Sequence, residues 1–151
     1  MTKTVAISGG FDPVHIGHIK MMQEARALGD RLIVILNNDH WLVKKKGFVF
    51  MNQKEREAVL RAIRYIDDVV VTDHPENPNN MSVSSMLRKL KPDVFANGGD
   101  RNEIDAANPK SSLYEDINTC KELGIQMVFN VGGEKTQSSS ELVKRAKAAT
   151  T

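Results

Sequence analysis

Short apolar runs alternate along the chain with segments in which apolar residues recur at helical spacing. Five runs predict buried strands, at residues 4–8, 31–36, 69–71, 94–96 and 126–129. Spacings of three and four predict helices at about 16–28, 52–65, 82–90, 112–123 and 138–148. Strands that alternate with helices in this order pair in parallel, so the pattern predicts an α/β fold with one Rossmann-like, doubly wound, five-stranded parallel sheet.

The chain of 151 residues suits one well-buried core, and we expect a single domain spanning 1–151. Internal repeats and low-complexity tracts are absent from the sequence. Segments 75–81 and 99–110 are rich in polar residues and are expected to be loops of that domain, not linkers between domains.

Charge and cysteine content narrow the function classes. The net charge of +2 suits an anionic small-molecule ligand and is well below the positive charge typical of a nucleic-acid-binding domain. The single cysteine, Cys120, cannot form an internal disulfide, which is typical of a reducing compartment. Residues 1–3 lead straight into a strand, and no apolar run approaches a membrane span. We therefore expect a cytoplasmic protein without membrane or nucleic-acid partners.

Polar, glycine-rich segments follow four of the five predicted strands. They are Gly9-Gly10, Asn37-Asn38-Asp39, Asn97-Gly98-Gly99-Asp100 and Gly132-Gly133. Open parallel sheets bind ligands outside the carboxyl ends of their strands, where the strand order reverses. The four segments are therefore expected to converge on one ligand-binding edge.

The segment 9–18 joins the first predicted strand to the first predicted helix. Free backbone N–H groups and the positive end of the helix dipole point toward a ligand there, and Gly17 leaves room for its approach. His15 and His18 stand at the mouth of this helix. Two imidazoles beside an anion site can donate to phosphate oxygens as charge develops on them, so the segment predicts a phosphate-binding site.

Five blocks of the chain resemble the motifs of the cytidylyltransferase-like nucleotidyltransferases. This superfamily includes glycerol-3-phosphate cytidylyltransferase and the adenylyltransferases of heptose phosphate, phosphopantetheine and nicotinate mononucleotide. The blocks are, in order, Gly10-Phe11-Asp12-x-x-His15-x-Gly17-His18, Lys44-Lys45-Lys46-Gly47, Glu55-Arg56 with 63–69, Gly98-Gly99-Asp100 and Ser138-Ser139-Ser140-Glu141-Leu142. Together they cover nearly the whole chain.

The resemblance implies that the phosphate of a small phosphorylated alcohol or sugar attacks the α-phosphorus of a nucleoside triphosphate, and that pyrophosphate leaves. It implies that His15 and His18 act in catalysis with Lys44 or Lys46, and that Mg²⁺ bridges the phosphates with few protein ligands of its own. The residues implied to bind the nucleotide are Gly9, Gly10, Phe11, Asp12, Gly17, Ser138, Ser139 and Ser140. Those implied to bind the acceptor are Arg56, Asp100 and Arg101, and a homodimer is implied as well.

Several of these residues also have an ordinary structural explanation. The pair Ser138 and Glu141 forms a capping box, which starts a helix with or without a ligand. Three successive lysines are typical of a solvated loop, and Lys44 and Lys46 share one side if that loop is extended. Relatives carry an arginine before the last helix, whereas here Lys135 is the nearest cation.

The substrate pair stays open. Gly98-Gly99-Asp100 resembles the heptose-phosphate adenylyltransferases, whereas Ile63-Arg64-Tyr65 and the compact length resemble glycerol-3-phosphate cytidylyltransferase. We favour CTP, with ATP as the alternative nucleotide. An alternative from a different class of function is a regulator that has the same fold and binds a nucleotide but does not catalyse a reaction.

Overall fold

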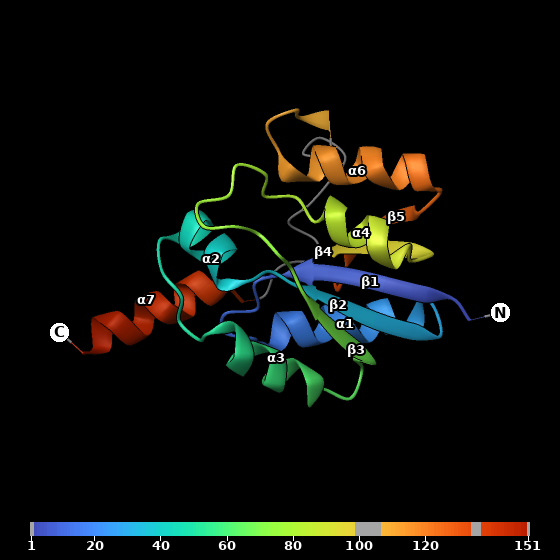
Figure 1. Ribbon diagram of the computed structural model, residues 1–151. Helices are drawn as coiled ribbons and strands as arrows, with labels where there is room; N and C mark the ends of the chain where they lie inside the picture. Colours follow the sequence, from blue (N-terminus) through green and yellow to red (C-terminus); the bar gives the residue numbers. More distant parts are fainter. Residues whose placement is uncertain (1, 99–106, 134–136, 151) are drawn as a thin grey trace.

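The computed structural model describes residues 2–98, 107–133 and 137–150. Five parallel strands form one sheet in the order β3-β2-β1-β4-β5 (Figure 1). The strands are β1 Thr4–Gly9, β2 Arg31–Leu36, β3 Asp68–Val71, β4 Val94–Gly98 and β5 Gln126–Val131. The chain adds β2 and β3 on one side of β1 and then crosses to add β4 and β5 on the other. The predicted doubly wound sheet is confirmed, and the carboxyl ends of β1 and β4 mark its switch point.

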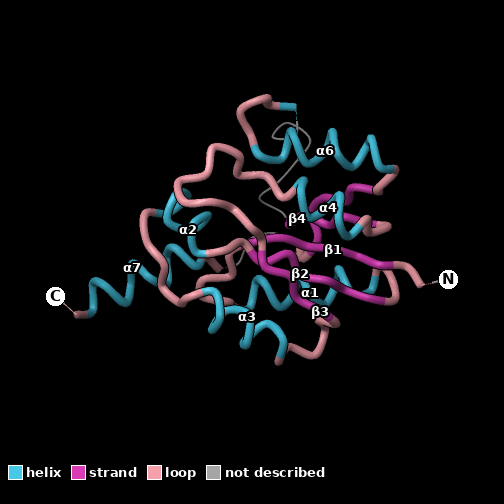
Figure 2. The backbone as a smooth tube through the Cα atoms, in the orientation of Figure 1, coloured by secondary structure: helices cyan, strands magenta, loops and turns pink. Residues whose placement is uncertain are grey.

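Helices cover both faces of the sheet, as Figure 2 shows. They are α1 Ile16–Ala27, α2 Asp39–Lys46, α3 Gln53–Arg61, α4 Ser84–Leu90, α6 Ser112–Leu123 and α7 Ser139–Ala149. One core packs α1 and α3 against β-strand residues such as Val5 and Ile7, and the other packs α4 and α6 against Ala6 and Ile35. Because both faces are covered, β2 is apolar and buried from Leu32 to Leu36 and does not alternate with polar residues, whereas β5 at the sheet edge has exposed Gln126 and Asn130. Within the described ranges, no helix is long and apolar enough to cross a membrane.

Helix α2 replaces the extended lysine loop that the sequence pattern predicts. Asn38 caps its first turn, with Oδ1 accepting a hydrogen bond from the Trp41 backbone N–H at 3.0 Å, and Gly47 ends it in the left-handed conformation with φ at 85°. Leu42 is its single buried residue, so the helix leaves almost no apolar periodicity in the sequence. The predicted helix 52–65 is also too long, because α3 ends at Arg61 and the chain turns before entering β3.

Cys120 lies buried on the inner face of α6. Burial, assisted by the nearby Asp116 carboxylate, raises the pKa of the Cys120 thiol from 9.0 to about 12. Since the thiolate is the reactive form, we expect iodoacetamide to leave Cys120 unmodified in the native protein at pH 8 and to modify it after denaturation, as measured by mass spectrometry. Rapid labelling of the native protein would contradict this placement.

The same shift affects stability at high pH. A thiol whose folded pKa lies above its unfolded pKa contributes stability below about pH 9, and the contribution is lost as the pH rises from 9 to 12. Lysine and tyrosine side chains titrate in the same range, so the comparison needs a variant. We expect Cys120→Ala to lose less unfolding free energy than the wild type between pH 9 and 12, as measured by urea denaturation.

Candidate active site

His15 and His18 are brought together at the start of α1. His15 is the N-cap residue, and its Nδ1 accepts a hydrogen bond from the Gly17 backbone N–H at 3.1 Å. The His15 backbone N–H donates in turn to Nδ1 of His18 at 3.2 Å, and the two rings stack with centroids 3.8 Å apart. A ring nitrogen that accepts a hydrogen bond cannot carry the proton, so each neutral imidazole is protonated on Nε2. The helix cap therefore orients two stacked rings with their Nε2–H donors on the side away from the backbone.

The loop before α1 is packed tightly against its neighbours. The Phe11 ring meets the His18 ring edge-on at 4.9 Å, and Phe11 has a positive φ of 49°. A Cβ atom on Gly9 would lie 3.0 Å from the Phe11 ring, and one on Gly10 would lie 2.8 Å from Leu42 Cδ2. Both glycines thus have a packing reason to lack a side chain, whether or not they touch a nucleotide.

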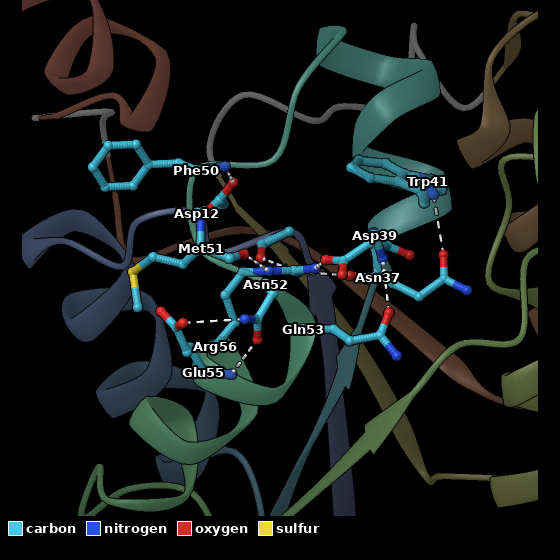
Figure 3. A network of polar contacts seen from close by, with 12 residues as sticks. Asp12, Asn37, Asp39, Trp41, Phe50, Met51, Asn52, Gln53, Glu55 and Arg56 are labelled. Carbon is cyan, nitrogen blue, oxygen red and sulfur yellow. Dashed lines mark hydrogen bonds and ion pairs between the residues drawn. The ribbon is translucent and has the colours of Figure 1, made fainter.

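Asp12 fastens this loop to the segment before α3. The carboxylate is 2 % exposed, and its oxygens accept hydrogen bonds from the backbone N–H groups of Phe50 at 2.7 Å and Met51 at 2.6 Å (Figure 3). An anionic carboxylate does not attract phosphate. The geometry makes Asp12 a positioning residue for the loop that carries the histidines, and the nucleotide contact expected from the sequence stays a prediction.

Arg56 occupies the centre of the same network. It is 1 % exposed, and its guanidinium donates to the carbonyls of Met51 at 2.8 Å, Gly10 at 2.8 Å and Asn37 at 2.7 Å. A fourth hydrogen bond, at 2.7 Å, pairs it with the Asp39 carboxylate. Figure 3 shows the guanidinium enclosed between these groups.

Four of the five N–H donors of Arg56 are thus satisfied inside the protein. This corrects the expectation that Arg56 binds the acceptor, because a fully buried guanidinium presents no open face to a ligand. Its role is to hold together the carboxyl ends of β1 and β2 and the segment before α3. The sequence contained no signal for this, since its partners lie up to 46 positions away.

The two candidate lysines lie in the last turn of α2. Lys44 is exposed, and its Nζ donates to Asn77 Oδ1 at 2.8 Å, whereas Lys46 is half-buried. Residues two apart on a helix differ in direction by about 200°, so Lys44 and Lys46 cannot face the same side as they would in an extended loop. Lys44 is held toward Asn77, so at most one of the two lysines can face a given ligand in this arrangement.

The first residues of α7 contact the loop that precedes α1 and leads to His15. Ser138 caps the helix, accepting a hydrogen bond from the Glu141 backbone N–H at 3.3 Å, which confirms one half of the predicted capping box. The Ser138 backbone N–H donates to Gln137 Oε1 at 3.0 Å and not to Glu141. The Ser139 hydroxyl donates to the Pro13 carbonyl at 2.7 Å across 126 positions of sequence, and Ser140 is exposed. Two helix N-termini, those of α1 and α7, are therefore joined at one place, and each is suited to bind an anion.

This arrangement separates the three serines experimentally. We expect Ser138→Ala to lower the unfolding free energy by about 1 kcal/mol through loss of the cap. Ser140→Ala should raise KM for the nucleoside triphosphate and leave the melting temperature unchanged. Ser139→Ala is less informative, because removing the hydroxyl also removes its hydrogen bond to the Pro13 carbonyl. An unchanged KM in Ser140→Ala would confine this helix start to a structural role.

A cavity of about 210 Å³ opens over the carboxyl edge of the sheet beside His18. Its apolar lining comes from Phe11, Met21, Trp41, Met81, Val83 and Leu113. Its polar lining includes Asn37 at the end of β2, Asn97 in β4 and Asp116 of α6. The polar segments that follow the strands were predicted to converge on one edge of the sheet. Residues of the segments at β1, β2 and β4 line this one cavity, so the prediction is confirmed for these three.

Two of the predicted site residues, Asp100 and Arg101, lie outside the described residues, as does Lys135, the cation nearest to the start of the last helix. Among the residues that are described, no group of three or more His, Cys, Asp and Glu side chains is arranged to hold a metal ion.

A doubly wound parallel sheet belongs to the α/β class that binds its ligands outside the carboxyl ends of the strands, and the paired histidines lie beside the cavity at that edge. Residues 6–145 match the cytidylyltransferase-like family, and the chain belongs to it. FAD synthase of Pyrococcus abyssi is 46 % identical over 110 residues, which are 72 % of this chain and 70 % of that protein. FAD synthase of Pyrococcus horikoshii is 42 % identical over the same shares.

The bifunctional protein HldE of Syntrophotalea carbinolica is 39 % identical over 144 residues, which cover 93 % of this chain and 27 % of that longer protein. The crystal structure of the lipopolysaccharide core biosynthesis protein from Thermoplasma volcanium GSS1 shares the fold. Its TM-score is 0.68 at 21 % identity, covering 89 % of this chain and 100 % of that one.

Proposed function

We propose that this protein transfers AMP from ATP to the phosphate of a small monoester, with flavin mononucleotide (FMN) as the first candidate, and releases pyrophosphate. The observation that carries the proposal is the 46 % identity to an FAD synthase over most of both chains. FAD consists of FMN and AMP joined through a pyrophosphate bond, so a nucleotidyltransferase forms it by adenylylating FMN. The expectations of CTP and glycerol phosphate find no support among the relatives described above.

In this reaction the FMN phosphate is already an anionic nucleophile, so the protein has to position the reactants and stabilise charge. The Nε2–H donors of His15 and His18 would bind oxygens of the α-phosphoryl group, where negative charge builds up in the transition state. The N-terminus of α7, with Ser140, would hold the departing pyrophosphate, and Lys46 would neutralise the triphosphate.

We also propose that Mg²⁺ enters the site as its complex with ATP. An ion that arrives on the nucleotide needs few protein ligands, because phosphate oxygens and water can supply the rest. Bound in this way, the ion would neutralise phosphate charge.

A sugar phosphate is the second candidate acceptor. The relation to the bifunctional protein HldE, which extends over 93 % of this chain, favours it. The two acceptors differ in shape, because FMN carries a large flat ring system and a sugar phosphate does not.

The test is a matrix of purified protein, Mg²⁺, ATP or CTP, and FMN, glycerol 3-phosphate or a heptose phosphate. Pyrophosphate release is followed continuously, and the products are identified by mass spectrometry. We expect ATP with FMN to give the fastest release and FAD as product. Turnover with CTP but not with ATP would favour the cytidylyltransferase alternative. Nucleotide binding without pyrophosphate release from any pair of nucleotide and acceptor would favour the regulator.

A further inference from the structure

Asn37 stands at the floor of the cavity, directly after β2. Its backbone is held on both sides: the N–H donates to the Gly9 carbonyl at 2.9 Å, and the carbonyl accepts from Arg56 at 2.7 Å. The residue is 3 % exposed and lines the cavity together with His18. The sheet and the buried arginine therefore fix the backbone of Asn37, and with it the root of the carboxamide, in the wall of the cavity that His18 also lines.

The Asn37 side chain is buried with an unsatisfied acceptor. Among the residues that the structure describes, Oδ1 of Asn37 is the buried side-chain atom without a hydrogen-bond partner. The neighbouring Asn38 differs, because its Oδ1 caps α2 and its Nδ2 donates to the His74 carbonyl at 2.9 Å. A buried carbonyl oxygen without a donor loses its hydration free energy and gains nothing in return. A ligand N–H group would remove that deficit.

The remainder of the cavity suits a flat heterocycle. Phe11 and Trp41 supply aromatic faces, and Met21 and Met81 supply thioethers, which pack well against planar rings. The Trp41 indole is held in place by a hydrogen bond from Nε1 to the Met81 carbonyl at 2.9 Å. Apolar walls with a few fixed polar groups are typical of sites that orient a ring. A sugar has hydroxyl groups all around it, so it would make few apolar contacts with these side chains.

We propose that Asn37 reads the ring end of the acceptor, with Oδ1 accepting a hydrogen bond from the imide N3–H of a flavin seated in this cavity. The imide N–H of the isoalloxazine ring lies between two carbonyl groups, and a carboxamide offers the matching acceptor and donor side by side. This assignment rests on the proposed adenylyl transfer and names the acceptor as a flavin phosphate rather than a sugar phosphate. Asn37 thereby becomes a specificity residue that lies apart from the phosphate-binding helix ends.

The experiment measures equilibrium binding of FMN and of N3-methyl-FMN by quenching of flavin fluorescence. The wild type, Asn37→Leu and the control Asn79→Leu are compared; Asn79 is exposed and is not among the cavity-lining residues. We expect the wild type and the control to bind FMN about tenfold more tightly than N3-methyl-FMN, which corresponds to about 1.4 kcal/mol. In Asn37→Leu that ratio should fall to about one, FMN should bind about tenfold more weakly, and the Kd for ATP should change less than twofold.

A thermal melt of the unliganded proteins separates recognition from a structural role. Leucine replaces an unsatisfied buried acceptor by an apolar group of similar size, so the melting temperature of Asn37→Leu should not fall. A structural asparagine would lower it. Should the leucine variant fail to fold, Asn37→Ala also removes the acceptor, and the ratio of the two flavins on the wild type requires no variant.

Three results would overturn the assignment. Equal binding of FMN and N3-methyl-FMN to the wild type would remove the imide contact. Weaker ATP binding by Asn37→Leu with unchanged FMN binding would place the adenine in the cavity. Absence of FMN binding would exclude the flavin, while pyrophosphate release with another monoester would still support the proposed transfer. A different result would separate the two proposals. If FMN binding depended on Asn37 but no pyrophosphate were released, this inference would stand and the proposed function would be wrong.

Discussion

Alanine in place of His18 is expected to lower kcat for nucleotidyl transfer by about 10²–10³, while the Kd for the nucleotide changes by less than about threefold. Donors aimed at charge that develops in the transition state contribute on this scale. The structure supplies the reason: Nδ1 of His18 is engaged by the backbone N–H of His15, which places the proton on Nε2. Steady-state kinetics with separate measurement of nucleotide binding checks the result.

His15 requires a different substitution, because it also caps α1. Asparagine keeps an acceptor at the position of Nδ1 and is a good N-cap residue, but it lacks the Nε2–H donor. His15→Asn should therefore melt like the wild type and still lose most of its kcat. His15→Gln, whose amide reaches the position of Nε2, should recover part of it. Loss of nucleotide affinity with normal turnover at saturation would show that the histidines bind the substrate and do not stabilise the transition state.

Replacing Arg56 by methionine is expected to lower the unfolding free energy by about 3 kcal/mol. The substitution keeps the volume of the side chain but leaves the Gly10, Met51 and Asn37 carbonyls without the donor. Breaking a buried ion pair costs about 3–5 kcal/mol, and the lower end applies because the Asp39 side chain is 34 % exposed and recovers hydration. Urea denaturation followed by circular dichroism measures the loss.

Arg61→Met is the matched control. Arg61 is 48 % exposed and pairs with Glu57 and Asp68 at the surface, where solvent screens such pairs and they contribute little to stability. Its variant should therefore unfold at a urea concentration much closer to that of the wild type than Arg56→Met does. If Arg56→Met were as stable as this control and instead lost acceptor affinity, Arg56 would be a substrate contact and its framework role would be wrong.

The sequence by itself determined the sheet, most of the helices and the place of the histidine pair. These features depend on local patterns. Apolar runs specify buried parallel strands, and helical spacing specifies α1 and α6. The capping box at His15 and the N-cap hydrogen bond of Ser138 each involve residues three positions apart. Information confined to a few neighbouring residues can be recovered without knowing the rest of the fold.

The tertiary structure decided which polar residues are buried with hydrogen-bond partners inside the protein. Helix α2 escaped prediction because its single buried residue, Leu42, leaves no periodic signal. Arg56 and Ser139 were expected to bind substrates, and the fold brings each to the carbonyl of a residue far away in the sequence. Asn37 and Asn38 are chemically identical neighbours, and only their different surroundings leave one with an unsatisfied buried oxygen. Burial and the supply of hydrogen-bond partners depend on segments far apart in the chain, and these properties separate a site residue from a structural one.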